Sequence, residues 1–263
     1  MNPFAIARLF HRSPRGIWLA VALAACLTLS NCASPASSTD GDTPVDAEFE
    51  EKVLQVIRDN PQVIIEAANA YRQQQQAEAQ EAQDAVAREV LKDPSGAIGE
   101  SPTKGAEDRN IVLFEFSDFQ CPYCAAALEA LDPFMERHGD EVTLVYKHLP
   151  LTQIHPEALP SAKASWAAQQ QGQFWPYHDA LFAAQDRLGE DLYVEIAEDL
   201  DLDMEQFNRD RNSAAAEQAI ADDMALVQRI GVNSTPTFFM NGRRVDLSED
   251  KAFEKVLEEI KAE

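Results

Sequence analysis

The chain has 263 residues, of which 45% are hydrophobic, and it carries a net charge of −23 at pH 7. This length predicts one or two domains of ordinary globular composition. The negative charge argues against binding to nucleic acid or to anionic lipid, because both depend on clustered lysine and arginine side chains. We interpret the excess of acidic residues as a contribution to solubility.

Residues 1–32 have the pattern of an export signal. A basic segment with three arginines precedes a short apolar run at residues 17–29, which is too short to cross a bilayer. The stretches "LAAC", ending at Cys26, and "LSNC", ending at Cys32, both resemble a bacterial lipobox, in which the cysteine becomes lipidated. The sequence therefore predicts a protein of the periplasm or cell envelope.

Two cysteines compete as the site of lipidation. Processing at Cys32 removes Cys26 with the signal and leaves Cys121 and Cys124 as the remaining pair. Processing at Cys26 would leave Cys32 as an odd thiol in an oxidising compartment. We therefore favour an anchor at Cys32. Simple cleavage after Ala24, which gives an unanchored protein, stays open as a third possibility.

Three segments lie between the signal and the main domain. Residues 33–45 are rich in Ser, Pro, Asp and Thr and predict a flexible linker. Residues 46–92 predict two helices, the second starting at Asn60 and Pro61. Their apolar stripes are too thin for independent folding, so they must cap the body or associate with another chain; we prefer self-association. Residues 93–108 carry several Gly and Pro and predict a second linker.

The main domain, residues 109–263, opens with a β-α-β pattern. The apolar run at residues 111–116 predicts a strand buried on both faces. Pro122 suits the first turn of a helix that runs to about His138, and residues 142–149 predict a second strand. Two strands joined by a helix predict parallel pairing with a right-handed crossover.

A helical block and a hairpin complete the predicted α/β fold. Residues 151–230 predict several helices separated by Gly- or Asp-rich turns. The strand "TPTFFM" is followed by Asn241 and Gly242, a pair typical of a tight hairpin turn, and by the return strand "RRVDL". Ser248 is predicted to cap a last helix.

Cys121 and Cys124 stand directly after the first predicted strand, with Pro122 and Tyr123 between them. A helix N-terminus lowers the pKa of a thiol from about 8.5, and the thiolate is the species that attacks disulfides. We predict that Cys121 attacks and that Cys124, one turn further in, resolves the mixed disulfide. Pro122 and Tyr123 are expected to tune the pair and to meet substrate. The redox-active disulfide is then the reactive group, and no other cofactor is expected.

Two other interpretations of the pair are weaker. A structural disulfide that encloses two residues would restrict the unfolded chain very little. A metal site needs further ligands, and the histidines show no ligand spacing, so no metal-binding residues are predicted. The alternative function is a non-enzymatic metal-handling or scaffold protein that uses both cysteines as soft ligands. We prefer thiol–disulfide exchange because strand–CxxC–helix in an exported chain is typical of it.

Four stretches carry a family resemblance over residues 109–263. They are "FEFSDFQCPYC", "VYKHLPL", "HPEALPSAKASWAAQQQGQFWPYHDALF" and "GVNSTPTFFMNG". Together they resemble the DsbA-like branch of the thioredoxin superfamily. The resemblance implies a thioredoxin fold with a helical insertion, and a protein disulfide oxidoreductase or isomerase. Its expected partners are cysteine-containing exported proteins and a membrane redox protein that recycles the pair.

The N-terminal helices carry a second resemblance. The stretch "IRDNPQVIIEA" is similar to the stalk of ScsC-like family members, which oligomerise through their N-terminal segment. This implies a homo-oligomer formed through residues 46–92. In such proteins several active sites around a cleft favour shuffling of wrong disulfides, whereas a monomer more often acts as an oxidase. The direction of the reaction stays open at this point.

The resemblance also assigns roles to four residues. Pro236 matches the family's cis-proline, which faces the cysteines and helps to hold extended substrate, and Thr235 would flank the substrate and modulate reactivity. Glu115 matches a buried acid, with Lys147 expected near it on the next strand. Burial should raise the pKa of Glu115 and Lys147 should lower it. The two would relay a proton to or from Cys124, or form a structural ion pair.

The remaining aromatic and histidine matches are interpreted as packing of the inserted helices. These residues are His155, Trp166, Trp175 and His178. Aromatic residues at helical spacing belong to a core more often than to a site. His148 stays undecided, because it follows the second strand near the cysteines.

Overall fold

A computed structural model describes residues 46–263, which divide into a first unit ending at Asn60 and a second unit, Pro61–Glu263. The predicted signal, the candidate lipidation cysteines and the linker at residues 33–45 lie outside the described residues. In the first unit, helix α1 (Ala47–Asp59) is capped by Asp46, whose side chain accepts from the Glu48 N–H. No residue of α1 is buried, and its apolar stripe is exposed.

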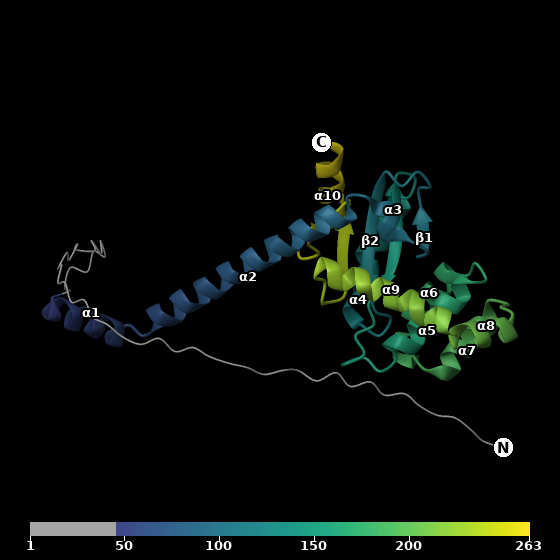
Figure 1. The fold of residues 1–263 in the computed structure, drawn as a ribbon, viewed down its shortest axis with the longest axis horizontal. Helices are drawn as coiled ribbons and strands as arrows, with labels where there is room; N and C mark the ends of the chain where they lie inside the picture. The colour runs from purple at the N-terminus through teal and green to yellow at the C-terminus, as the bar shows by residue number, and fades with distance from the viewer. Residues whose placement is uncertain (1–45) are drawn as a thin grey trace, which may run out of the picture. The chain divides into compact units, whose positions relative to one another are not determined.

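The second unit contains nine α-helices and five strands in the described residues. The helices are α2 (Gln62–Leu91), α3 (Pro94–Ile98), α4 (Pro122–His138), α5 (Ala158–Gln169), α6 (Phe174–Ala183), α7 (Glu190–Asp199), α8 (Met204–Arg211), α9 (Ala214–Ile230) and α10 (Ala252–Lys261), with a 3-10 turn at Gln185–Arg187. The strands are β1 (Thr103–Gly105), β2 (Ile111–Ser117), β3 (Val142–His148), β4 (Thr237–Met240) and β5 (Arg243–Val245) (Figure 1).

The strands form one mixed sheet in the order β1-β3-β2-β4-β5. The central β2 and β3 are parallel, with Phe114 opposite Val145, which confirms the predicted pairing. Every other neighbour is antiparallel. Asn241 and Gly242 both adopt positive φ in the turn between β4 and β5, as a tight hairpin turn requires. The thioredoxin-like α/β architecture predicted from the sequence is confirmed.

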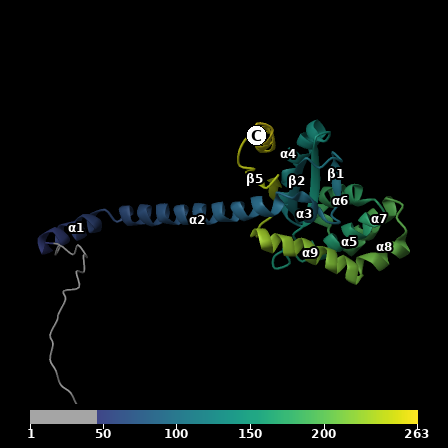
Figure 2. The same cartoon turned by 45° about the horizontal axis from the view of Figure 1, so that its top comes forward.

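Helices cover both faces of the sheet (Figure 2). On one face α4 and α10 pack against apolar side chains such as Leu113 and Phe238. On the other face α3, α9 and the last turns of α2 pack against Phe114 and Phe239. The helices α5–α8 share a third core with the start of α4, and this core includes both cysteines. The redox pair therefore lies where the helical insertion meets the sheet.

The prediction that residues 93–108 are a plain linker is wrong. Helix α3 buries Ala97 and Ile98, and β1 pairs antiparallel with the edge of β3. The strand "TKG" has too few apolar residues to be recognised from pattern, but it satisfies backbone groups that β3 would otherwise expose. The prediction that Ser248 caps the last helix is also wrong. Helix α10 begins only at Ala252, and the Ser248 hydroxyl donates to Asp246 instead.

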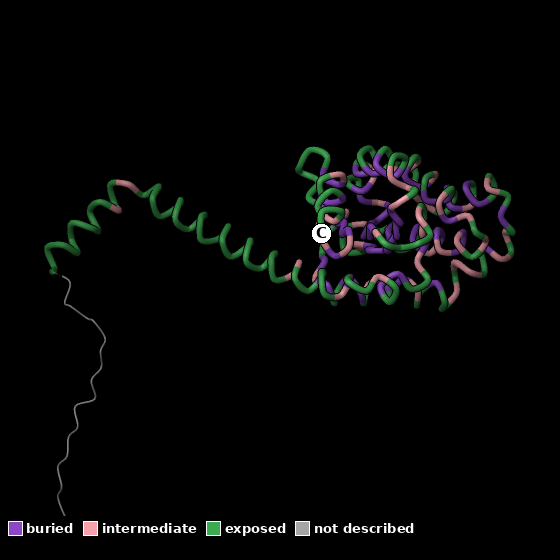
Figure 3. Tube along the Cα trace, turned by 90° about the horizontal axis from the view of Figure 1, so that it is seen from above, coloured by how far each residue is buried: buried purple, intermediate pink, exposed green. Residues whose placement is uncertain are grey.

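Helix α2 joins the fold through its C-terminal turns alone. Figure 3 shows it exposed along most of its length and buried near its end. Ala87 and Leu91 belong to the core against α9, and Asp84 forms an ion pair with Arg244 at 2.7 Å. The predicted cap therefore exists for these turns, while apolar residues nearer the start of α2 stay uncovered in the single chain. In residues 46–263 no helix is long and apolar enough to span a membrane.

Replacing Leu91, which is 1% exposed, with alanine should lower the free energy of unfolding by about 2–5 kcal/mol, because a buried side chain leaves the core. Val86→Ala is the matched control on the same helix, because Val86 is 46% exposed. It should change the value by less than about 0.5 kcal/mol. Urea unfolding measures both. Equal and small effects would mean that α2 lies outside the cooperative unit.

Candidate redox site

The two cysteines occupy the junction between β2 and α4. Cys121 is the residue before the helix, with extended backbone angles (φ −76°, ψ 118°), and Pro122 takes the first helical position. The Cys121 carbonyl accepts from the N–H of Cys124 at 3.0 Å. One turn of helix therefore separates a residue outside the helix from a residue inside it, as predicted.

The loop before β4 faces Cys121. The Thr235–Pro236 peptide bond is cis, as the family resemblance implied, and the Cys121 thiol donates to the Thr235 carbonyl at 3.5 Å. Cys121 is 4% exposed and Cys124 is fully buried, and the structure holds both as unpaired thiols. Tyr123 points outward and is 74% exposed. The structure thus brings together all the residues predicted to bind substrate.

A groove of about 1090 Å³ opens beside this loop. Tyr123, Thr235 and Pro236 line it together with residues from the start of α10. Gln80 and Asp84 of α2 line it as well. The N-terminal helix is therefore part of the wall of the groove, which the sequence did not predict.

The two thiols have opposite acid strengths. The pKa of Cys121 is lowered from 9.0 to about 5, mainly by a hydrogen bond from the Cys124 thiol, against the opposing effect of burial. The Thr235 hydroxyl, which has no other partner in the described residues, and the backbone N–H groups of Cys124 and Tyr123 lower it further. Burial, followed by the bond to Cys121, raises the pKa of Cys124 far above its ordinary value. Cys121 is therefore a thiolate at neutral pH while Cys124 keeps its proton.

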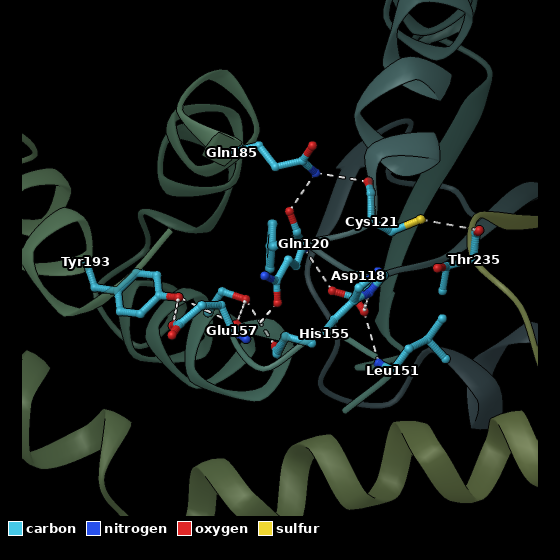
Figure 4. A network of polar contacts seen from close by, with 12 residues as sticks. Asp118, Gln120, Cys121, Leu151, His155, Glu157, Gln185, Tyr193 and Thr235 are labelled. Carbon is cyan, nitrogen blue, oxygen red and sulfur yellow. Dashed lines mark hydrogen bonds and ion pairs between the residues drawn. The ribbon is translucent and has the colours of Figure 1, made fainter. Parts of the chain in front are cut away.

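A buried carboxylate that the sequence analysis missed holds the loop before Cys121 (Figure 4). Asp118 accepts from the Gln120 N–H at 2.8 Å, the Leu151 N–H at 2.9 Å and the ring nitrogen Nδ1 of His155 at 2.7 Å. His155 is therefore more than packing of the inserted helices. An acidic residue three positions before the first cysteine was a visible signal for this role.

Gln185 fixes the same loop from the helical insertion. Its side-chain amide donates to the carbonyls of Phe119 at 2.8 Å and Cys121 at 2.9 Å (Figure 4). Both acceptors lie in the loop that presents the reactive thiol. The insertion thus positions Cys121 through a polar contact as well as through apolar packing.

The predicted contact between Glu115 and Lys147 is wrong. In the parallel register Lys147 lies opposite Phe116, and Glu115 lies opposite Tyr146. Neighbouring residues of a strand point to opposite faces, so the carboxylate and the ammonium group are on different sides of the sheet. Lys147 does not lower the pKa of Glu115; burial raises that pKa and His178 partly offsets the rise.

Lys147 belongs to a separate buried network. Its ammonium group donates to Asp223 at 2.9 Å, to the Ser101 hydroxyl at 2.7 Å and to the Ile98 carbonyl at 3.1 Å. Asp223 also accepts from the backbone N–H of His148 at 2.9 Å. These contacts tie α9 and the segment before β1 to the sheet. The predicted alternative, a structural ion pair between Glu115 and Lys147, is therefore wrong as well, because Lys147 pairs with Asp223.

The sequence of the chain matches a known protein family over most of the second unit. The family model described as thioredoxin matches residues 97–259. The chain belongs to the thioredoxin family. The match begins within α3, before the domain boundary predicted at residue 109. The matched range therefore includes β1.

Solved structures place this thioredoxin-family chain among DsbA-like folds. A thioredoxin-like oxidoreductase from Silicibacter pomeroyi DSS-3 is 28% identical, covers 63% of this chain and 94% of its own, and gives a TM-score of 0.57. The thiol-disulfide exchange protein alpha-DsbA2 from Wolbachia pipientis is 19% identical over 68% and 98% of the two chains, with a TM-score of 0.59. ScsC from Proteus mirabilis is 21% identical over 82% and 96%, with a TM-score of 0.54. These likenesses show that the chain shares the fold of the DsbA-like proteins that its sequence resembles.

The curated relatives match a smaller part of this chain than the solved structures do, and only a small part of their own length. The Na(+)/H(+) antiporter NhaA of Herminiimonas arsenicoxydans is 39% identical over 147 residues, which are 56% of this thioredoxin-family chain and 23% of the antiporter. The NhaA 3 antiporter of Salinispora tropica is 39% identical over 141 residues, 54% and 22% of the two chains. The chain thus spans less than a quarter of these relatives. The Na(+)/H(+) antiport in these names refers to those longer proteins as a whole.

The described residues offer no alternative metal centre. Within residues 46–263, no group of three or more His, Cys, Asp or Glu side chains is arranged to hold a metal ion. The two cysteines of this thioredoxin-family site are free thiols beside a cis-proline loop.

The reduced protein should show one thiolate transition near pH 5, followed by ultraviolet absorbance of the thiolate, because Cys124 does not ionise in the accessible range. Cys124→Ala removes the main donor and should raise the pKa of Cys121 towards its ordinary value. Thr235→Val should raise it by less. A transition between pH 8 and 9 in the unaltered protein would contradict the geometry. Since folding lowers this pKa, the thiolate stabilises the reduced form fully above the unfolded pKa and ceases to do so as the pH falls through 5.

Proposed function

We propose that this protein is a thiol–disulfide oxidoreductase of the cell envelope that forms or rearranges disulfides in exported proteins. The observation that carries the proposal is the pair of opposite thiols at the start of α4: Cys121 ionised beside the cis-Pro236 loop, and Cys124 buried and protonated. A structural neighbour titled as a thiol-disulfide exchange protein supports it.

The oxidising reaction proceeds through two exchanges. A substrate thiolate attacks the Sγ of Cys121 in the Cys121–Cys124 disulfide, the S–S bond breaks, and Cys124 leaves with the electron pair and takes a proton. A second substrate thiolate attacks the substrate sulfur of the mixed disulfide, and Cys121 leaves as a thiolate. The substrate loses two electrons and the cysteine pair gains them. A membrane redox protein that accepts these two electrons would restore the disulfide.

The acid strength of Cys121 favours the oxidising direction. Stabilising the thiolate stabilises the reduced pair, and a stable reduced pair makes its disulfide a strong oxidant. The same thiolate is also the species that opens a wrong disulfide, so reduced protein would be able to start isomerisation. The groove formed by Tyr123, Thr235 and Pro236 would hold an extended substrate segment next to Cys121.

Exposed apolar residues on the N-terminal helices support self-association. On α1 they include Phe49 and Val56, and on α2 they include Ile64 and Tyr71, which lie seven residues apart and so share a helix face. Faces of this kind are normally covered in a stable assembly. A homo-oligomer through residues 46–92 would gather several redox sites, which suits isomerisation. An anchor at Cys32, or at Cys26, would hold the assembly at the membrane.

Reactivation of a protein with scrambled disulfides, and oxidation of a dithiol peptide, test the proposed activity. The unaltered chain should catalyse both reactions, and Cys121→Ser should abolish both because it removes the nucleophile. Glu136→Gln is the matched control on the same helix, because Glu136 is exposed and its replacement keeps both cysteines and the groove. Full activity in Cys121→Ser, or none in the unaltered chain, would sink the proposal.

The double variant Ile64→Glu/Tyr71→Glu tests the role of the α2 face. It should give a smaller particle in light scattering and a several-fold loss of isomerisation, with dithiol oxidation retained, because charges on an apolar contact oppose association. Gln73→Glu/Gln76→Glu adds the same charge without removing apolar surface. Truncation before β1 is unsuitable, since it would remove buried Leu91 from the core. An unaltered particle size in the first variant would remove the support for an oligomer.

A further inference from the structure

Buried polar atoms without partners gather on one face of the sheet. Eight buried side-chain nitrogen or oxygen atoms in the described residues have no hydrogen-bond partner, and seven of them belong to five residues. These residues are Glu115, Ser117, Tyr146, His148 and His178. Native proteins pair nearly all such groups, so a cluster of exceptions calls for a functional explanation.

Strand register places four of the five side by side. Glu115 lies opposite Tyr146 and Ser117 lies opposite His148, and all four point to the same face because they alternate with the residues between them. This is the face that meets the helical insertion and Cys124, since Tyr146 and Cys124 share one core. The cluster therefore lies against the thiol that must exchange a proton in every turnover.

His178 of α6 completes the cluster. Its ring meets the ring of Tyr146 edge-on with centroids 5.2 Å apart, and it contacts Phe119 and Phe182 as well. The ring nitrogen Nδ1 pairs with the Asp179 carboxylate at 2.8 Å, and the other nitrogen, Nε2, is buried without a partner. Asp179 is 63% exposed on its side chain. His178 thus connects a solvent-exposed carboxylate to the buried face.

The bond to Asp179 selects the tautomer of a neutral His178. A proton on Nδ1 donates to the carboxylate, and the lone pair of Nε2 is then free to accept a proton from within the buried cluster. Glu115, whose pKa is raised by burial, carries its proton to higher pH than an ordinary carboxyl group. Lys147 was predicted to lower the pKa of Glu115, but its side chain lies on the opposite face of the sheet.

We propose that His178, held by Asp179, is the positioning residue that sets the proton affinity of Glu115, the group that exchanges a proton with Cys124 during turnover. The proposal rests on the proposed function. When the disulfide opens, Cys124 leaves as a thiolate and Glu115 gives it a proton. The Glu115 carboxylate then regains a proton from water, and the charge of His178 sets how tightly Glu115 holds it. In the reverse reaction each proton moves the other way.

Other ionisable groups pack around Glu115 and His178 and influence where Glu115 gains and loses its proton. From α4 come Cys124 and Asp132, and Asp132 acts to raise the pKa of Glu115. From β3 come Tyr146 and His148, both fully buried; burial raises the pKa of Tyr146 and lowers that of His148 to about 4. His148 is therefore neutral at physiological pH, whereas the interaction with His178 acts to lower the pKa of Glu115.

The first test is a titration that does not depend on activity. The carboxyl carbon of Glu115, assigned with Glu115→Gln, is followed by NMR against pH in the unaltered protein and in His178→Gln. Removing the positive charge should move the Glu115 midpoint to higher pH. Asp179→Asn should move it the same way by less, because it weakens the charged form of His178. Glu198→Gln, on the exposed side of α7, is the matched control and should leave the midpoint unchanged.

The second test is kinetic. Single-turnover reduction of the disulfide by a dithiol, corrected for the thiolate fraction of that dithiol, should slow as the pH rises through the Glu115 midpoint. His178→Gln should move this decline to higher pH, so the variant should be faster than the unaltered protein at a pH between the two midpoints. In a Glu115→Gln background the histidine substitution should change nothing further.

The outcomes separate the proposal from the function on which it rests. An unmoved Glu115 midpoint in His178→Gln overturns the proposal, whatever the activity. The same loss at every pH, and with or without Glu115, assigns His178 to packing alone and also overturns it. A protein that catalyses no exchange in any form defeats the proposed function, while the NMR titration still reports on the pairing of Glu115 with His178.

Discussion

The N-terminus of α4 is the constraint on which the site depends. A helix leaves its first backbone N–H groups unpaired, and Pro122 begins the helix at a position where its missing N–H costs nothing. Cys121 then stands just outside the helix and faces these N–H groups, while Cys124 lies one turn inside and under the core. The same short segment therefore makes one thiol acidic and keeps the other protonated.

The helical insertion does more than shield this segment. Its residues hold the loop before Cys121 through the bonds from Gln185 and His155, and its core surrounds Cys124. Asp118 is the hub of these bonds because a buried carboxylate can accept several hydrogen bonds at once. The reactive thiol is thus fixed from two sides, by the insertion and by the cis-proline loop.

The two faces of the central strands carry different ionisable groups: a paired lysine and aspartate on one face, and an unpartnered glutamate on the other. Lys147 and Asp223 form a fully satisfied buried pair that ties α9 to the sheet, and breaking such a pair leaves an uncompensated charge. The opposite face carries Glu115 and its unpartnered neighbours beneath Cys124. One face is therefore suited to holding the fold and the other to moving protons. Gln80 and Asp84 of α2 line the groove beside the cis-proline loop.

The sequence by itself determined the elements whose signals are local. Cys121, Pro122 and Cys124 mark the strand–helix junction, the two apolar runs give the parallel pair, and Asn241 with Gly242 gives the hairpin, because each follows from nearby backbone geometry. The family resemblance supplied Pro236. Only the tertiary structure decided the partners of Lys147 and His178, the separation of Glu115 from Lys147, and the pairing of β1. Those contacts join residues far apart in the chain, and the offset of one position between Glu115 and Lys147 in register sends their side chains to opposite faces.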